Sequence, residues 1–293
     1  MNVPPRMADL RPASPAPAGA AGARDVAAHL RFIRGGGRTV LARQHVPYPF
    51  HITRPFWLDR ALPEMATLYL QSSSGGLYTG DRLTLDIEVG KGAQAHITSQ
   101  AATVVHRTTD DEARFSTTLR IEADAFLALT NDPFILFPDA HLSSSTQVVL
   151  APGGRAILVD GFATHDPAQG GRPFGTLRTE LSVRDAGGRL LVRDRGGLTG
   201  LHFASPASPL GPYRAMGSLV ALGRAHGDMD IAALMSQLDA LDCRVGISPL
   251  PNECGIAVRC LAPSGGHLAR GMALAFAAVF EAWMGHAPPP LRK

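Results

Sequence analysis

Four side chains in the first half of the chain could contact a metal ion. They are Asp81, His96, His106 and Asp132. A closed metal site needs three or four ligands at a defined geometry, and the two histidines have neither the i, i+4 spacing of a helix nor the i, i+2 spacing of a strand. A single histidine is more often a surface or hydrogen-bonded residue. The pattern therefore suits transient, weak contact with a metal ion better than storage.

Polar residues also follow two otherwise apolar stretches. The first group contains Thr98, Ser99 and Thr103, and the second contains Asn131 and Asp132. Buried polar groups need hydrogen-bond partners or water. If the two stretches stack, these groups fall at equivalent points, where they would form either an internal hydrogen-bond ladder or a wet channel. The sequence leaves both interpretations open.

The motifs of several large enzyme classes are missing from the sequence. It has no G-x-S-x-G nucleophile elbow, no P-loop, no H-E-x-x-H zinc motif and no G-x-G-x-x-G after a strand. The glycine clusters at 34–37 and 74–76 lack the Lys-Ser/Thr tail of a phosphate-binding loop and indicate turns. A Ser/His/Asp triad is recognised by geometry, so the sequence does not test for one. The interpretation favoured here is that the chain is not an enzyme.

The elements that must position these residues show a period of two. Leu83, Leu85 and Ile87 alternate with polar residues, which is typical of half-buried strands. Three similar stretches, at 87–98, 119–130 and 148–159, recur at offsets of 32 and 29 residues, and each resembles strand, tight turn, strand. The pattern predicts a mainly β fold with β-helix-like layered sheets, in which each unit covers its neighbour's apolar face. Chance similarity among hairpins is the alternative.

The pattern divides the chain into three parts. Residues 1–24 are rich in Pro and Ala and are expected to be a disordered leader, residues 25–204 a β-rich domain, and residues 213–287 a small C-terminal α/β segment packed on it. That segment is predicted to run helix, strand, strand, helix.

The C-terminal segment carries two helical stripes. Asp228 is a candidate cap for the first helix, and strands are expected near 244–249 and 255–261. The second helix is expected from about Ser264 to Trp283, with an apolar face that could be core or partner surface.

Charge and cysteine content exclude several kinds of partner. The net charge is +3, from 28 basic and 25 acidic residues without a basic run, so neither nucleic acid nor a membrane surface is expected as a partner. The longest apolar run, 272–280, is too short to span a bilayer. The three cysteines form no C-x-x-C pair and suit reduced thiols in the cytoplasm.

Several segments resemble the UreD (UreH) family of urease accessory proteins. The matching stretches are ITRPFWLD (52–59), GGLYTGDRLTLDIEV (75–89), TSQAATVVHR (98–107), FLALTNDPFILFPDA (126–140) and GRPFG (171–175). Departures from the family pattern occur at Ser99, Val104, His106, Asn131, Asp132 and Thr176. Thr176 stands where the family has a glutamate, and Glu180 is the nearest carboxylate.

The resemblance implies a β-helical scaffold for nickel delivery to urease. Members of the family bind UreF-like and UreG-like accessory proteins, dock with them on apo-urease, and are thought to pass nickel through a water-filled tunnel. Ni²⁺ accepts oxygen and nitrogen ligands, and a path of weak polar sites lets an ion move on. No tightly bound cofactor is expected, only transient Ni²⁺. The residues expected along such a path are Asp81, His96, Thr98, Ser99, Thr103, His106, Asn131, Asp132 and Glu180.

Other interpretations remain open at this stage. The departures from the family pattern leave room for a β-solenoid ligand-binding module or an enzyme of a different pathway, and for an adaptor that holds partners without passing an ion. Asp81 could instead pair with Arg82 or cap a turn.

Overall fold

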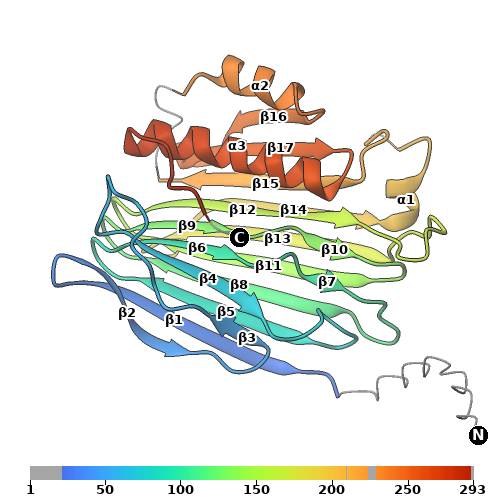
Figure 1. The fold of residues 1–293 in the computed structure, drawn as a ribbon, viewed down its shortest axis with the longest axis horizontal. Coiled ribbons are helices and arrows are strands. Elements are labelled where there is room, and N and C mark those ends of the chain that lie inside the picture. The colour runs from blue at the N-terminus through green and yellow to red at the C-terminus, as the bar shows by residue number, and fades with distance from the viewer. Residues whose placement is uncertain (1–21, 209, 224–228, 292–293) are drawn as a thin grey trace, which may run out of the picture.

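Two β-sheets stacked face to face make up most of the molecule (Figure 1). The computed structural model describes residues 22–208, 210–223 and 229–291. Within these residues the first sheet has seven strands, in the order β14 (Leu190–Thr199), β13 (Thr176–Asp185), β11 (His141–Leu150), β8 (Ala113–Ile121), β5 (Arg82–Val89), β1 (Asp25–Gly35) and β2 (Arg38–His45).

The second sheet has ten strands in the same described part of the chain. Its main order is β16 (Arg244–Pro249), β17 (Gly255–Ala262), β15 (Ala215–Leu222), β12 (Arg155–Thr164), β9 (Phe126–Thr130), β6 (Gln94–Ser99), β4 (Ala66–Ser72) and β3 (Phe50–Ile52). Beyond the end of β9, the short strand β10 (Phe134–Leu136) pairs with β12 and with β7 (Val104–Val105).

The layered repeat predicted from the sequence is confirmed. β5, β8 and β11 pair in parallel in the seven-stranded sheet, and β6, β9 and β12 pair in parallel in the ten-stranded sheet. The register joins Gln94 to Phe126 and Phe126 to Arg155, which reproduces the offsets of 32 and 29 residues. Each repeat therefore places one strand in each sheet, as the β-helix-like prediction requires.

Two apolar cores follow from this arrangement. The first lies between the sheets and includes Leu85, Ile97 and Leu158. The second lies between the other face of the ten-stranded sheet and the helices α2 (Ile231–Asp239) and α3 (Gly265–Met284), which Figure 1 shows beside β15, β16 and β17. The apolar face of α3 is thus core, and Ser264 caps this helix as predicted.

The C-terminal segment departs from the prediction in two details. It contains an additional strand, β15, which pairs with β12 and makes the segment a continuation of the ten-stranded sheet. The cap of α2 is Asp230, whose carboxylate accepts a hydrogen bond from the N–H of Ala233, while Asp228 lies outside the described residues. The strands expected near 244–249 and 255–261 are present as β16 and β17.

Two short helices complete the described fold. α1 (Gly200–Ala204) follows β14, and the 3₁₀ helix Pro251–Glu253 joins β16 to β17. Most of the predicted leader, residues 1–21, lies outside the described residues. No helix of the described chain has the length and apolar character needed to cross a bilayer.

Candidate functional site

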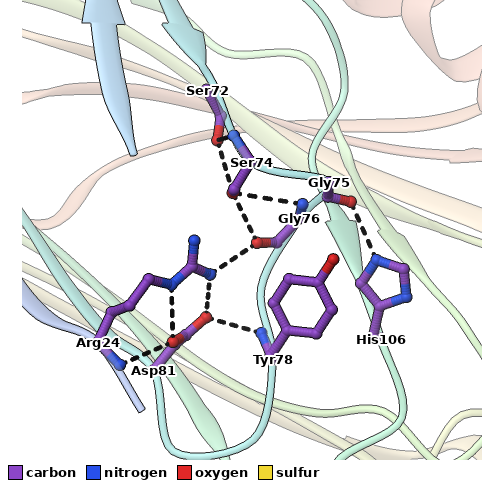
Figure 2. Close-up of polar contacts among 8 residues, drawn as sticks. All are labelled: Arg24, Ser72, Ser74, Gly75, Gly76, Tyr78, Asp81 and His106. Carbon is purple, nitrogen blue, oxygen red and sulfur yellow. Dashed lines mark hydrogen bonds and ion pairs between the residues drawn. The ribbon is translucent and has the colours of Figure 1, made fainter. Parts of the chain in front are cut away.

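Asp81 holds the start of β1 against the start of β5 (Figure 2). Its carboxylate accepts hydrogen bonds from the backbone N–H and the Nε–H of Arg24, both at 3.0 Å, and from the N–H of Tyr78 at 2.8 Å. The Arg24 guanidinium completes an ion pair with it. Burial opposes ionisation of Asp81, but the hydrogen bonds from Arg24 and Tyr78 outweigh burial and hold its pKa below the ordinary value.

Asp81 therefore has a structural partner that the sequence did not reveal. The pairing of Asp81 with Arg82 was wrong, because Arg82 pairs with Asp111 instead. The capping role considered for Asp81 is observed, since its carboxylate binds the N–H of Tyr78 three residues before it.

The two histidines are not brought together. His96 is fully buried under α3, where its ring packs 5.1 Å from the ring of Phe276 and its Nε2 lies 2.9 Å from Oγ1 of Thr130. His106 stacks on Tyr78 with ring centroids 4.5 Å apart, and its Nε2 donates to the carbonyl of Gly75 (Figure 2). Among the described residues no group of three or more His, Cys, Asp or Glu side chains could hold a metal ion.

The polar groups at the strand ends divide between the two faces of the ten-stranded sheet. Thr98 alternates with Ile97 and lies on the α3 side, where its hydroxyl donates to the carbonyl of Thr130 at 2.9 Å. Ser99 has the same parity as Ile97 and lies on the side facing the other sheet. The hydrogen-bond ladder thus forms on one face, and the groups that line a cavity lie on the other.

A row of polar residues crosses the interior face of the ten-stranded sheet. The repeat offsets of 32 and 29 residues carry Ser99 to Asn131 and Asn131 to Asp160. The row continues in register from Asp160 to Ser218 in β15 and from Ser218 to Arg259 in β17. We call Ser99, Asn131, Asp160, Ser218 and Arg259 the polar stripe.

The facing sheet supplies polar partners to this stripe. Ser144 and Thr146 of β11 point inward between the apolar Leu142 and Val148, and Asp194 of β14 has the same inward orientation as Val192. The Asp194 carboxylate forms an ion pair with Arg259 across the gap between the sheets. Polar side chains from both sheets therefore meet within an otherwise apolar interior.

Two adjoining cavities lie between the sheets along the polar stripe. The larger, of about 290 Å³, extends from Asn131 to Arg259, and the smaller, of about 70 Å³, extends from Asn131 to Ser99 and Thr103. Residues common to both cavities are Asn131, Phe134, Ser144, Thr146, Asp160 and Gly161. Because the linings overlap, the two cavities adjoin. We refer to them together as the polar space, because the polar stripe runs along both, although most of their lining is apolar.

The ten-stranded sheet is interrupted at this point. β9 ends at Thr130 and β10 begins at Phe134, so that residues 131–133 leave the strand opposite Asp160. Asn131, Asp132 and Asp160 also line an outer groove of about 520 Å³ between α3 and the C-terminal tail. The large interior cavity and the outer groove thus share Asn131, Val159 and Asp160 in their linings.

Asp160 has an unusual electrostatic environment. Protein packs around Asp160 from both sheets and from α3, yet the residue is exposed, because it faces the cavities and the outer groove. Burial raises the pKa of Asp160 to about 6, the nearby charge of Asp194 adds to the rise, and Arg259 opposes it. With a pKa of about 6 the carboxylate is still mostly ionised at neutral pH, so it can attract a cation.

The remaining predicted residues lie as follows. The backbone N–H of Asp132 donates a hydrogen bond to Ser99 Oγ at 2.6 Å, which joins the first two repeats at the small cavity. Glu180 borders the large cavity, but its carboxylate pairs on the outer face with Arg193 at 2.9 Å and Arg195 at 3.1 Å. Hydrogen bonds from Arg195 and Arg193 lower the pKa of Glu180.

Sequence reasoning missed Asp160, Asp194 and Arg259. The signal for Asp160 was present, because it is the one acidic residue inside the apolar run ILVDGFA and lies one repeat beyond Asn131. Asp194 and Arg259 meet only through the pairing of distant strands, which no local pattern reveals.

Comparison with known proteins identifies the family. The model of the UreD urease accessory protein family matches residues 24–293. The chain is 52% identical to urease accessory protein UreD 1 of Methylorubrum extorquens (strain PA1), over 97% of this chain and 98% of that protein. It is 41% identical to UreD 3 of Bradyrhizobium sp. (strain ORS 278), over 89% and 92% of the two chains. The chain belongs to the UreD family of urease accessory proteins.

Proposed function

We propose that the chain is a non-catalytic subunit that delivers nickel during urease maturation in the cytoplasm, and that Ni²⁺ passes between its two sheets along the polar stripe. The partners in this proposal are UreF-like and UreG-like accessory proteins and apo-urease. Family membership supports a role in urease maturation and favours it over an enzyme or ligand-binding module of another pathway.

The observation that carries the proposal is the polar stripe, which runs along two adjoining cavities inside an apolar sandwich. Here Asn131 and Asp160 line both interior cavities and the outer groove. A purely structural core would fill this position with apolar side chains, whereas a passage for a hydrated cation needs oxygen atoms and room for water.

The composition of the stripe suits an ion in transit. Carboxylate, amide and hydroxyl oxygens are weak ligands for Ni²⁺ compared with thiolate or imidazole clusters. Among the described residues no three potential His, Cys, Asp or Glu ligands converge. A path of this kind attracts the ion and lets it leave, as delivery requires.

The test is to block the passage without disturbing the scaffold. Asn131→Leu and Asp160→Leu place apolar volume where the cavities meet, and Glu180→Gln is the control, because its carboxylate lies on the outer face. Each variant is co-expressed with urease and the other accessory proteins at limiting nickel. We expect complex formation to persist, and the nickel content and activity of urease to fall in the blocked variants but not in the control.

The result distinguishes the passage from an adaptor role. If the blocked variants form the complex and urease acquires its normal nickel content, the chain holds its partners without carrying the ion. That outcome refutes the proposed route through the sandwich.

A further inference from the structure

Arg259 bridges the two sheets at one end of the large interior cavity. It projects from β17 on the interior face, and its guanidinium contacts the carboxylate of Asp194 in β14 and the hydroxyl of Ser218 in β15. Asp194 and Ser218 belong to different sheets, so the side chain of Arg259 spans the polar space.

The ion pair is open to water. The side chains of Arg259 and Asp194 keep 40% and 45% of their surface accessible. An ion pair with this exposure contributes little to stability, because water competes for both charges. The contact between Arg259 and Asp194 can therefore open and close without unfolding the strands that carry it.

Arg259 also sets the charge of the cavity. The carboxylates that face it are Asp160 and Asp194, because the carboxylate of Glu180 pairs on the outer face. With Arg259 in place the three groups sum to one negative charge when both carboxylates are ionised, and without it they sum to two. The influence of Arg259 reaches Asp160 as well, since it opposes the rise in the pKa of that group.

We propose that Arg259 is the internal counter-ion of the passage: its guanidinium occupies Asp194 while the passage is empty and yields this carboxylate to a passing divalent cation. The inference rests on the proposed nickel route. Its consequence is that Ni²⁺ is held weakly next to Asp160 and Asp194 and is released when the guanidinium returns.

The expected size of the effect follows from Coulomb's law. Even at the dielectric constant of bulk water, removing a unit positive charge about 6 Å from a dication strengthens the binding of that dication about tenfold. A less polar interior would increase this factor. Removing Arg259 should therefore make the passage bind Ni²⁺ tightly and release it slowly.

The experiment measures binding of Ni²⁺ alone to the full chain, purified in complex with its accessory partners, by equilibrium dialysis and by release to a chelator. At low ionic strength, Arg259→Gln should bind Ni²⁺ about tenfold more tightly, release it more slowly, and lower the nickel content of urease at limiting nickel. Arg259→Lys keeps the charge and should stay close to the wild type. Arg193→Gln, which breaks an arginine–carboxylate pair on the outer face, is the matched control.

Two further variants keep the test decisive. Asp160→Asn in the Arg259→Gln background should return the affinity for Ni²⁺ towards the wild-type value. If Arg259→Gln gives no complex, Asp194→Asn serves instead, and it should weaken Ni²⁺ binding because it removes a carboxylate and leaves Arg259 in place. Unchanged affinity in Arg259→Gln, or in Asp194→Asn where that variant replaces it, overturns the role of Arg259.

Failure of this inference can be separated from failure of the nickel route. If Asp160→Asn lowers the nickel content of urease but Arg259→Gln leaves the Ni²⁺ affinity unchanged, the route stands and the counter-ion role is wrong. If neither variant changes the nickel content or the affinity, both are wrong.

Discussion

Replacing Asp81 by Asn tests whether this residue stabilises the fold or conducts the ion. The carboxylate is almost fully buried, at 1% exposure, and accepts three hydrogen bonds of 2.8–3.0 Å besides its ion pair with Arg24. Removing one partner of a buried pair costs about 3–5 kcal/mol when the other charge stays buried. The Arg24 side chain keeps 15% of its surface accessible and can be partly hydrated, so we expect a loss of about 2–3 kcal/mol.

The assay is thermal or urea unfolding of the complexed chain, followed by fluorescence of its two tryptophans. The expected loss corresponds to a decrease in Tm of about 3–5 °C for a chain of this size. The control is Asp111→Asn, which breaks an ion pair with Arg82 whose side chains are 39% and 51% exposed and should cost less than about 1 kcal/mol.

The pH dependence supplies a second readout. The folded pKa of Asp81 lies below its unfolded value of 3.8, so the stabilisation is fully present above that pH and is lost as pH falls further. The stability difference between wild type and Asp81→Asn should therefore shrink in acid. Equal stability losses in Asp81→Asn and Asp111→Asn would refute the structural role of Asp81. If Asp81→Asn instead lowers the amount of nickel delivered per folded complex, Asp81 contributes to the nickel path.

Three further variants test the packing of the C-terminal segment. Gly217→Val should cost about 1–3 kcal/mol, because a Cβ there would lie 2.8 Å from the Leu268 side chain of α3; urea unfolding measures this. Phe280→Ala removes a fully buried ring and should cost about 3–5 kcal/mol in the same assay. His286→Gln removes the hydrogen bond to Asp59 that raises the pKa of this histidine. Because this pKa is raised, His286 stabilises the fold fully below its unfolded pKa of 6.5, and the stabilisation is lost as pH rises through the folded pKa. The Tm of wild type should therefore exceed that of the variant only in acid, which a series of Tm measurements against pH would show.

The repeat was predictable because parallel pairing in a layered fold forces equivalent residues into register. The offsets of 32 and 29 residues, read from three degenerate stretches, are the offsets by which β6, β9 and β12 pair. The helix α3 was predictable for a local reason, since Ser264 and a continuous apolar stripe define its start and its buried face.

β15 could not be predicted in the same way. Its sequence, AMGSLVAL, lacks a clear alternation, because one face packs against the inter-sheet core and the other against α3. A strand covered on both faces carries no period of two. The structural role of Asp81 was missed for a different reason. Its partner, Arg24, lies 57 residues away in sequence, and only the pairing of β1 with β5 brings the two together.

The register of the repeats does not by itself decide which face of the sheet each polar residue occupies. The offset of the repeats places Thr98 beside Thr130 and Ser99 beside Asn131, but the alternation of a strand sends these two pairs to opposite faces. One pair closes a hydrogen bond under α3, and the other borders the polar space between the sheets. Extending the same register by one repeat gives Val159 on the α3 side and Asp160 between the sheets. In the third repeat the row on the α3 side thus has an apolar residue, whereas the interior row has a carboxylate. This difference is the reason for assigning the cation path to the interior row.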